Sequence, residues 1–104
     1  MKILGHRVEL QEIDHALREA SGEEIAVAVA WPRNGASAEG VVGFVPISCA
    51  RNEAVIIEEC KKKLPNYMAP NRIVFIENIP FNSNAKIDRI QLQGFLEREK
   101  GIKK

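Results

Sequence analysis

Apolar and polar residues alternate along the chain in blocks that predict short secondary-structure elements. Residues 1–8 predict two short strands that turn at Gly5. Leu10, Ile13 and Leu17 then recur at helical spacing, and Gly22 is a residue type that commonly ends a helix. The apolar run at residues 24–31 predicts a buried strand, which we expect to pair with a second strand at 41–47 across the polar segment 32–40.

The middle of the chain predicts a second helix. Asn52 is a favourable N-cap, and Pro65 ends the helix after about residue 64. The apolar positions 56, 60 and 64 form its inner face. On the outer face, Glu59 is placed one turn before Lys63, so we expect an ion pair between them and a similar pair between residues 58 and 62.

The last third of the chain predicts a strand, a polar loop and a final helix. The strand is expected at residues 72–77 and the loop at 81–86. Asp88 stands three residues before Gln91, a capping-box spacing that opens a helix. The apolar content of this helix comes from Ile90, Leu92, Phe95 and Leu96. The whole order is that of a small α+β domain with a sheet of about three strands, flanking helices and an N-terminal hairpin.

Composition excludes several classes of function but does not identify the function itself. The 104 residues allow a single small domain, and 45% hydrophobic with 28% charged residues is ordinary globular composition. Fifteen basic and 14 acidic residues give a formal charge of +1, which argues against nucleic acid or an anionic membrane as partner. No apolar run approaches the roughly 20 residues that cross a bilayer, and the N-terminus has no signal-peptide core. We therefore expect a cytoplasmic protein.

Most residues capable of chemistry have a simpler structural explanation. His6 and His15 are expected to be surface or half-buried histidines, so no metal site is predicted. Cys49 and Cys60 form no C-x-x-C pair and are expected to be free structural thiols. The run at 61–63 predicts a solvated, basic helix end, with docking of an acidic partner as the alternative.

The polar loop near the C-terminus is more suggestive. Its sequence, PFNSNAKIDR at residues 80–89, presents Lys86 at the edge where the loop closes. A lysine in this position is a mobile point charge suited to phosphate or carboxylate oxygens. Since most loop lysines are merely solvated, the residues alone leave both interpretations open.

Three segments of the chain resemble one known family. GHRVELQEID at 5–14 resembles G-x-R-I/V-E-x-x-E-I-E, LPNYMAP at 64–70 resembles L-P-x-Y-M-x-P, and NAKIDR at 84–89 resembles N-G-K-I/V-D-R. These are segments of the C-terminal subdomain of acyl-adenylate-forming enzymes, which include acyl-CoA synthetases, nonribosomal peptide synthetase adenylation domains and D-alanine–carrier protein ligases. Each motif is weak alone, but the three occur in order and cover essentially the whole chain.

The resemblance implies an ATP-dependent acid–thiol ligase. Such enzymes join a carboxylic acid to ATP, releasing pyrophosphate, and then pass the acyl group to the thiol of CoA or of a carrier-protein phosphopantetheine. A larger N-terminal domain holds ATP, Mg²⁺ and the acid, and the small domain is a lid that rotates between the half-reactions. Residues 1–104 would be this lid alone, inactive until an N-terminal domain joins it in cis or in trans.

The same resemblance implies roles for individual residues. Lys86 matches the lysine that enters the site for adenylation. The loop with Gly5, His6, Arg7 and Glu9 matches the one that faces the pantetheine thiol, either in direct contact or as loop structure. Within the matching segment at 64–70, Tyr67 and Met68 are expected to be packing residues. Two residues depart from the pattern where glycine is usual: Ala85, which costs about 1 kcal/mol if that position needs a positive φ, and Gln11.

Several functional hypotheses remain open on the sequence alone. A non-catalytic module that docks a carrier protein or a partner ligase is the main alternative to a catalytic lid. Regulation by acetylation of Lys86 is a further possibility, because it would remove the charge. The motif at 64–70 mildly favours the carrier-protein branches over the CoA branch. The residues do not identify the acid, because the acyl pocket would lie elsewhere, and they leave the oligomeric state open.

Overall fold

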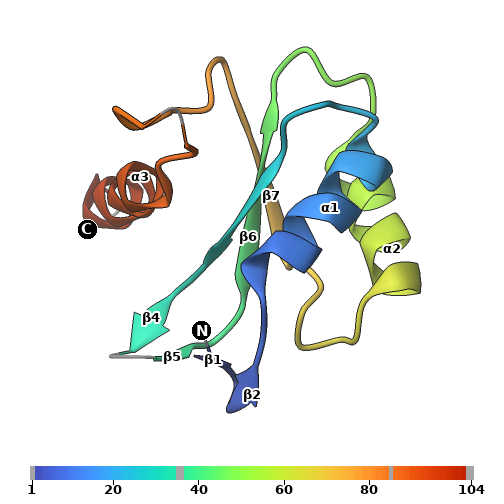
Figure 1. Ribbon diagram of the computed structural model, residues 1–104, viewed down its shortest axis with the longest axis horizontal. Helices are drawn as coiled ribbons and strands as arrows, with labels where there is room; N and C mark the ends of the chain where they lie inside the picture. The colour runs from blue at the N-terminus through green and yellow to red at the C-terminus, as the bar shows by residue number, and fades with distance from the viewer. Residues whose placement is uncertain (1, 35–36, 85, 103–104) are drawn as a thin grey trace.

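The fold consists of a three-stranded sheet between two helical layers (Figure 1). The computed structural model describes residues 2–34, 37–84 and 86–102. The helices are α1 (Leu10–Ser21), α2 (Glu53–Lys63) and α3 (Arg89–Ile102). Helices α1 and α2 cover one face of the sheet and α3 lies over the other. The predicted α+β class and the three predicted helices are confirmed.

The central sheet has the order β3-β6-β7 and is formed by β3 (Val27–Ala30), β6 (Val41–Pro46) and β7 (Arg72–Ile76). Strands β3 and β6 are antiparallel, and β6 and β7 are parallel. Alternate residues of β3 enter different cores: Ala28 packs with the α1–α2 side, and Val27 packs with the α3 side. This explains why the sequence of β3 is apolar without interruption.

Gly43 allows α1 to lie close against the centre of the sheet. A Cβ at this position would stand 2.9 Å from a methyl carbon of Leu17 on α1 and 2.9 Å from the Cδ1 of Ile73 on β7. Both neighbours are buried, so neither has free space to move into. The glycine therefore sets the distance between the helix layer and the sheet.

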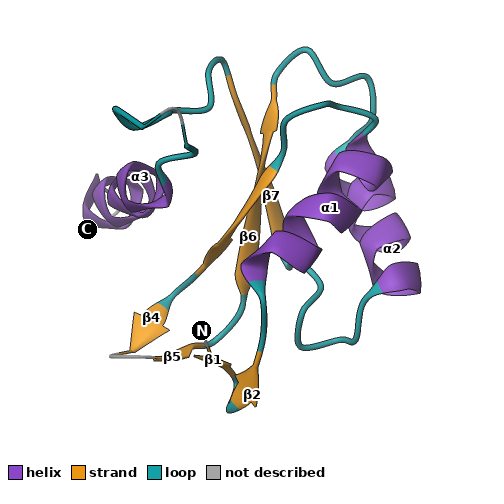
Figure 2. Cartoon of the chain, viewed as in Figure 1, coloured by secondary structure: helices purple, strands orange, loops and turns teal. Residues whose placement is uncertain are grey.

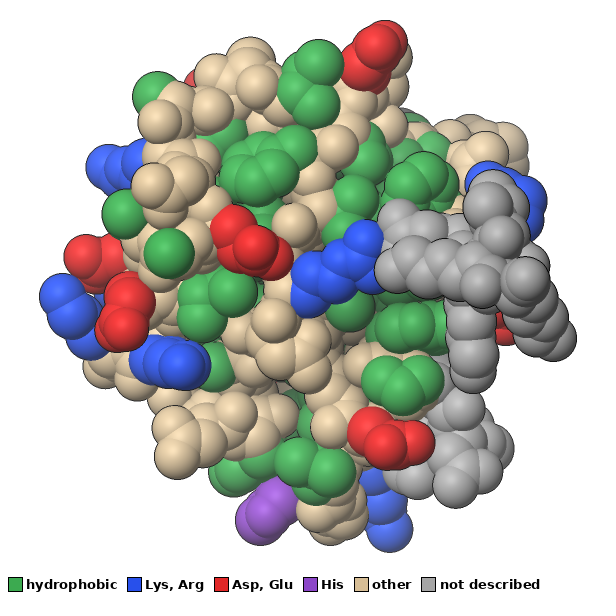
Figure 3. Space-filling model, turned by 180° about the vertical axis from the view of Figure 1, so that it is seen from behind, with side chains coloured by type: hydrophobic (Ala, Val, Ile, Leu, Met, Phe, Trp, Pro, Cys, Tyr) green, Lys and Arg blue, Asp and Glu red, His purple; other side chains and the backbone are tan. Residues whose placement is uncertain are grey.

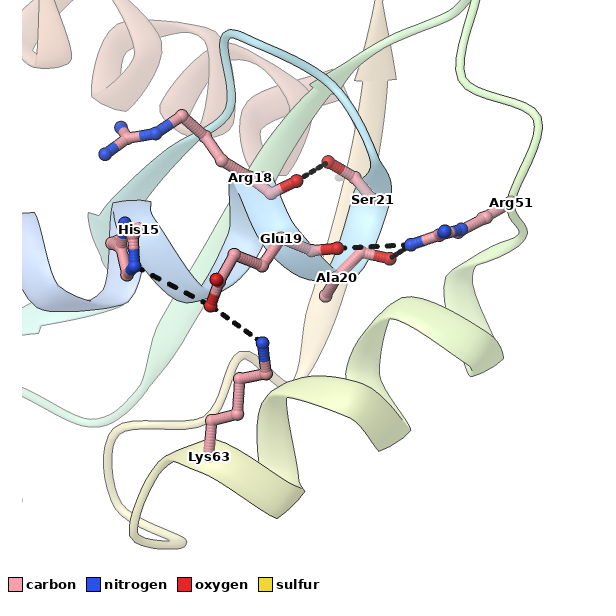
Figure 4. A network of polar contacts seen from close by, with 7 residues as sticks. All are labelled: His15, Arg18, Glu19, Ala20, Ser21, Arg51 and Lys63. Carbon is pink, nitrogen blue, oxygen red and sulfur yellow. Dashed lines mark hydrogen bonds and ion pairs between the residues drawn. The ribbon is translucent and has the colours of Figure 1, made fainter.

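The helix ends agree with the expected caps. Gly22 ends α1 with φ +76°, and its N–H donates to the carbonyl of Arg18 at 3.0 Å. Arg51 reaches across from the segment before α2, and its Nη1 donates to the carbonyls of Glu19 at 3.1 Å and Ala20 at 2.6 Å (Figure 4). At the start of α2, the side chain of Asn52 accepts from the N–H of residue 55 at 2.9 Å.

The two predicted ion pairs on α2 were wrong. Lys63 does not bind Glu59 but reaches α1, where its Nζ lies 2.7 Å from Glu19 Oε1. Glu59 is instead 3.5 Å from Lys62, one position from its expected partner. Ile90, which contributes to the apolar content of α3, is 80% exposed at the first turn of the helix.

The N-terminal hairpin belongs to a small second sheet that the sequence pattern did not predict in full. The expected strands β1 (Lys2–Ile3) and β2 (His6–Arg7) pair as an antiparallel hairpin. The segment predicted as a loop contributes β4 (Arg33–Asn34) and β5 (Ser37–Ala38), and β5 pairs in parallel with β1. Strands of two residues are too short for alternation to be visible in a sequence.

Charges of both signs are interspersed on the surface. On the face seen in Figure 3, acidic and basic side chains lie among apolar ones, as expected for a formal charge of +1. Among the residues that the structure describes, no helix has the length and apolar character needed to cross a membrane.

Candidate functional site

The loop that carries Lys86 is a closed, hairpin-like turn between β7 and α3 (Figure 2). Phe81 and Ile87 form an isolated antiparallel bridge across its base. The N–H of Asn82 donates to the carbonyl of Lys86 at 2.7 Å, and the N–H of Asp88 donates to the carbonyl of Pro80 at 3.0 Å. The side chain of Lys86 is exposed at the closing edge, as the sequence predicted.

The side chain of Asn82 holds the inside of this turn. Its Oδ1 accepts from the N–H of Asn84 at 2.8 Å and from the N–H of Lys86 at 3.2 Å. A short amide side chain that bonds the backbone two residues on is a common way to form a turn. Ala85, where the family pattern has glycine, lies outside the described residues, so the expected effect of that departure stays a prediction.

The end of the loop is attached to the core by a partly buried ion pair. Arg89, the first residue of α3, directs Nη1 and Nη2 at the two carboxylate oxygens of Asp14, with Nη1 to Oδ1 at 3.0 Å. The Asp14 side chain is only 6% exposed, and its Oδ1 also accepts from the N–H of Ala28 at 2.7 Å. Arg89 completes the cluster by donating to the carbonyl of Ala28. Asp88, beside it, caps α3 by accepting from the N–H of Gln91 at 3.0 Å, as predicted.

Lys86 lines an open hollow of about 660 Å³ between its loop and α1. The other side chains that contribute are Gln11, Asp14, Arg18, Phe81, Ile87 and Arg89. Because Arg89 is neutralised by Asp14, the uncompensated charges among these lining residues are those of Lys86 and Arg18. The arrangement can therefore accept an anionic group beside the lysine.

The hairpin at residues 2–7 lies at the opposite end of the molecule from the Lys86 loop (Figure 1). Gly5 adopts φ +82° in the turn, and a Cβ added there would meet nothing within 4 Å. His6, Arg7 and Glu9 are all exposed. The four residues predicted for a second site thus occupy one accessible turn and the segment that leads into α1, at the other end of the molecule from the loop at 81–88.

The second motif segment supports this hairpin. The ring of Tyr67 stacks on that of His6, with centroids 3.9 Å apart and 14° between the planes. Tyr67 is partly buried against the α1–α2 core, and Met68 is 6% exposed, so both are packing residues as predicted. The three motif segments are therefore joined in space, the first to the third by Asp14–Arg89 and the first to the second by His6–Tyr67.

Sequence reasoning missed Asp14 and Arg89 as partners. A signal for Asp14 was present, because it falls between Ile13 and Leu17 on the apolar face of the predicted helix. An acidic residue on such a face needs a buried partner. The sequence could not say which cation would reach it, since Arg89 is 75 residues away.

The remaining candidate groups have structural surroundings. Cys60 is fully buried, and that burial raises the pKa of its thiol to about 11. His15 lies on the surface, 3.6 Å from Glu19. The pKa of the Glu19 carboxyl is lowered, chiefly by its hydrogen bond and charge interaction with Lys63 and then by His15 (Figure 4). Within residues 2–34, 37–84 and 86–102, no three histidine, cysteine or acidic side chains are grouped so that they could hold a metal.

Comparison with known proteins gives relatives along almost the whole chain. It is 36% identical to the anguibactin system regulator of Vibrio anguillarum over 108 residues, covering 96% of this chain. It is 35% identical to a plipastatin synthase polypeptide of Bacillus subtilis and 32% identical to the D-alanine–D-alanyl carrier protein ligase of Staphylococcus haemolyticus, covering 86% and 88% of this chain. The chain spans only 10%, 3% and 20% of these three proteins. No protein-family profile matches it.

Solved structures share the fold. The Vibrio cholerae adenylation domain AlmE, in complex with glycyl-adenosine-5'-phosphate, superposes with a TM-score of 0.83 at 30% identity, over 94% of this chain and 18% of that one. An acyl-CoA synthetase of Brucella canis has the same fold, with a TM-score of 0.77 at 21% identity, over 96% of this chain and 20% of that one. The sequence and structural matches together establish that this chain is homologous to the small C-terminal part of the adenylate-forming enzymes.

Proposed function

We propose that this chain is the catalytic lid of an ATP-dependent acid–thiol ligase, with Lys86 serving the adenylation half-reaction. The observation that carries the proposal is the loop geometry at the third motif. Lys86 is exposed on a hydrogen-bonded turn whose end is clamped to the core, beside a hollow open to an anion. Homology to the C-terminal part of adenylate-forming enzymes supplies the reaction class.

In the proposed adenylation step, a carboxylate oxygen attacks the α-phosphorus of ATP and pyrophosphate leaves. Negative charge from both reactants crowds at this centre. The ammonium group of Lys86 would contact both, orient them and offset the charge. Since the lysine belongs to a separate small domain, rotation of that domain could bring it in for one step and withdraw it for the next.

In the proposed thioester step, the sulfur of a thiol attacks the acyl carbonyl and AMP leaves. The hairpin turn with Gly5, His6 and Arg7, together with Glu9, would face the pantetheine arm. Gly5 suits this role because backbone without a side chain can approach a ligand closely, and the space beside its Cα is open. The hairpin lies at the other end of the domain from the loop at 81–88, which is compatible with one face for each half-reaction.

The proposal assigns most of the ligands to other partners. As in the family that the motifs resemble, ATP, Mg²⁺ and the acid would bind an N-terminal adenylate-binding domain, in cis or in trans. CoA or a carrier-protein phosphopantetheine would be the thiol. The small domain would contribute Lys86 and the hairpin turn to sites completed by these partners.

The test separates the two half-reactions in the assembled enzyme. Lys86→Ala is expected to reduce formation of acyl-adenylate while leaving thioester formation from supplied acyl-adenylate nearly intact. Gly5→Val is expected to reduce thioester formation from supplied acyl-adenylate while leaving formation of acyl-adenylate nearly intact. Equal loss of both steps in Lys86→Ala would refute the assigned role, and binding of a carrier protein without any effect on ligation would favour a docking module instead.

A further inference from the structure

We propose that Asp14 and Arg89 are positioning residues for Lys86, holding the lysine loop in register with the core. This inference rests on the function proposed above. Asp14 lies on α1, and Arg89 begins α3, three residues after the lysine. The pair thus links the first and third motif segments at the point where the lysine loop enters its helix.

A continuous set of contacts runs from the core to the lysine. Asp14 Oδ1 accepts from Ala28 N–H of β3 at 2.7 Å, and the two Asp14 oxygens receive Nη1 and Nη2 of Arg89. Arg89 follows the bridge between Phe81 and Ile87, and the bond from Asn82 N–H to Lys86 C=O closes the turn above it. Displacement of Arg89 would therefore displace the end of the turn that carries Lys86.

The chemistry of the pair demands arginine and a carboxylate. A guanidinium offers two parallel N–H groups that match both carboxylate oxygens, and here one of them also serves the Ala28 carbonyl. A lysine would keep the charge but could not fill these positions at once. Misplacement of a catalytic group by about 1 Å can cost roughly 100-fold in rate, so a loosened pair should be visible in the chemical step.

Loss of the Asp14–Arg89 pair should affect only one half-reaction, because the hairpin is held by a different contact. The hairpin at 2–7 is held by stacking of His6 on Tyr67, at the other end of the molecule from the lysine loop. Loss of the Asp14–Arg89 pair should then slow the step that uses Lys86 and spare the step assigned to the hairpin. A pair with a purely structural role would instead lower both steps together.

The experiment compares Arg89→Lys, Asp14→Asn and the neutral double variant Asp14→Asn/Arg89→Gln in the assembled enzyme. We expect kcat for acyl-adenylate formation to fall about 10- to 100-fold in the single variants, while thioester formation from supplied acyl-adenylate stays within about twofold. The matched control is Lys63→Gln. It breaks the exposed ion pair between Lys63 and Glu19, which lies on α1 like Asp14, and it should leave both steps unchanged. Equal losses in both steps, or no loss in either, would overturn the inference.

A second measurement covers variants that fold poorly. Amide hydrogen exchange in the 104-residue chain should show residues 82 and 86 exchanging at least about tenfold faster in Arg89→Lys, with hairpin amides unchanged. Uniformly faster exchange would contradict a local positioning role. Failure of the underlying function is distinguishable, because it would appear as a Lys86→Ala variant that forms acyl-adenylate at the normal rate.

Discussion

Replacement of Asn82 by alanine should loosen the lysine loop without unfolding the domain. Asn82 Oδ1 accepts two backbone hydrogen bonds, from Asn84 at 2.8 Å and from Lys86 at 3.2 Å. Each such bond contributes about 0.5–1.5 kcal/mol net, and because this side chain is exposed we take about 1–2 kcal/mol for the two together. Since 1.4 kcal/mol is a factor of ten, the open loop should become roughly 5- to 30-fold more populated.

The assay is amide hydrogen exchange of Lys86 and Asn82, followed by NMR. Both amides should exchange faster in Asn82→Ala by the factor above, while amides of β6 keep their protection. Asn82→Asp is the matched control, because a carboxylate oxygen can accept the same two bonds and should preserve slow exchange. The reasoning would be refuted if Asn82→Ala left the Lys86 amide unchanged, or if Asn82→Asp behaved like the alanine variant.

Three further predictions concern the core and the α1–α2 surface. Gly43→Ala should lower the free energy of unfolding by about 1–3 kcal/mol in urea titrations, because its Cβ meets buried methyl groups at 2.9 Å. Burial raises the pKa of Cys60 to about 11, so the protein should lose stability as pH rises from about 9 to 11 and the thiol ionises more readily in the unfolded chain; a Cys60→Ala variant that kept this extra slope would count against it. Lys63→Gln should raise the pKa of Glu19 toward 4.5, as followed by NMR, since Lys63 is the main cause of its lowering, and an unmoved pKa would show that the ion pair does not form in solution.

The central sheet was predictable because burial leaves a strong pattern in the sequence. The uninterrupted apolar run of β3 and the caps Gly22 and Asn52 each have one simple structural explanation. The apolar content of α3 did not specify which side of the helix would face the sheet, and Ile90 is 80% exposed. The ion pair of Lys63 was predicted wrongly because its partner Glu19 lies 44 residues away, on another helix.

The exposed lysine of the candidate site could be predicted from the sequence, but the contacts that hold its loop and the hairpin could not. Lys86 stands in a polar loop with a recognisable motif, so its exposure at the closing edge followed from local sequence. The loop and the hairpin are held by contacts between segments that are distant in the sequence, Asp14 with Arg89 and His6 with Tyr67. Motif spacing alone carries no information about such pairs, which only the folded chain brings together.

The most direct test of the account is single-turnover formation of acyl-adenylate by the assembled enzyme with Lys86→Gln. Loss of one preorganised charge at the reacting centre should slow this step by about 100- to 1,000-fold. Lys61→Gln, an exposed lysine on α2, is the matched control and should retain the normal rate. A Lys86→Gln enzyme that formed acyl-adenylate as fast as this control would contradict the claim that the chain supplies the catalytic lysine.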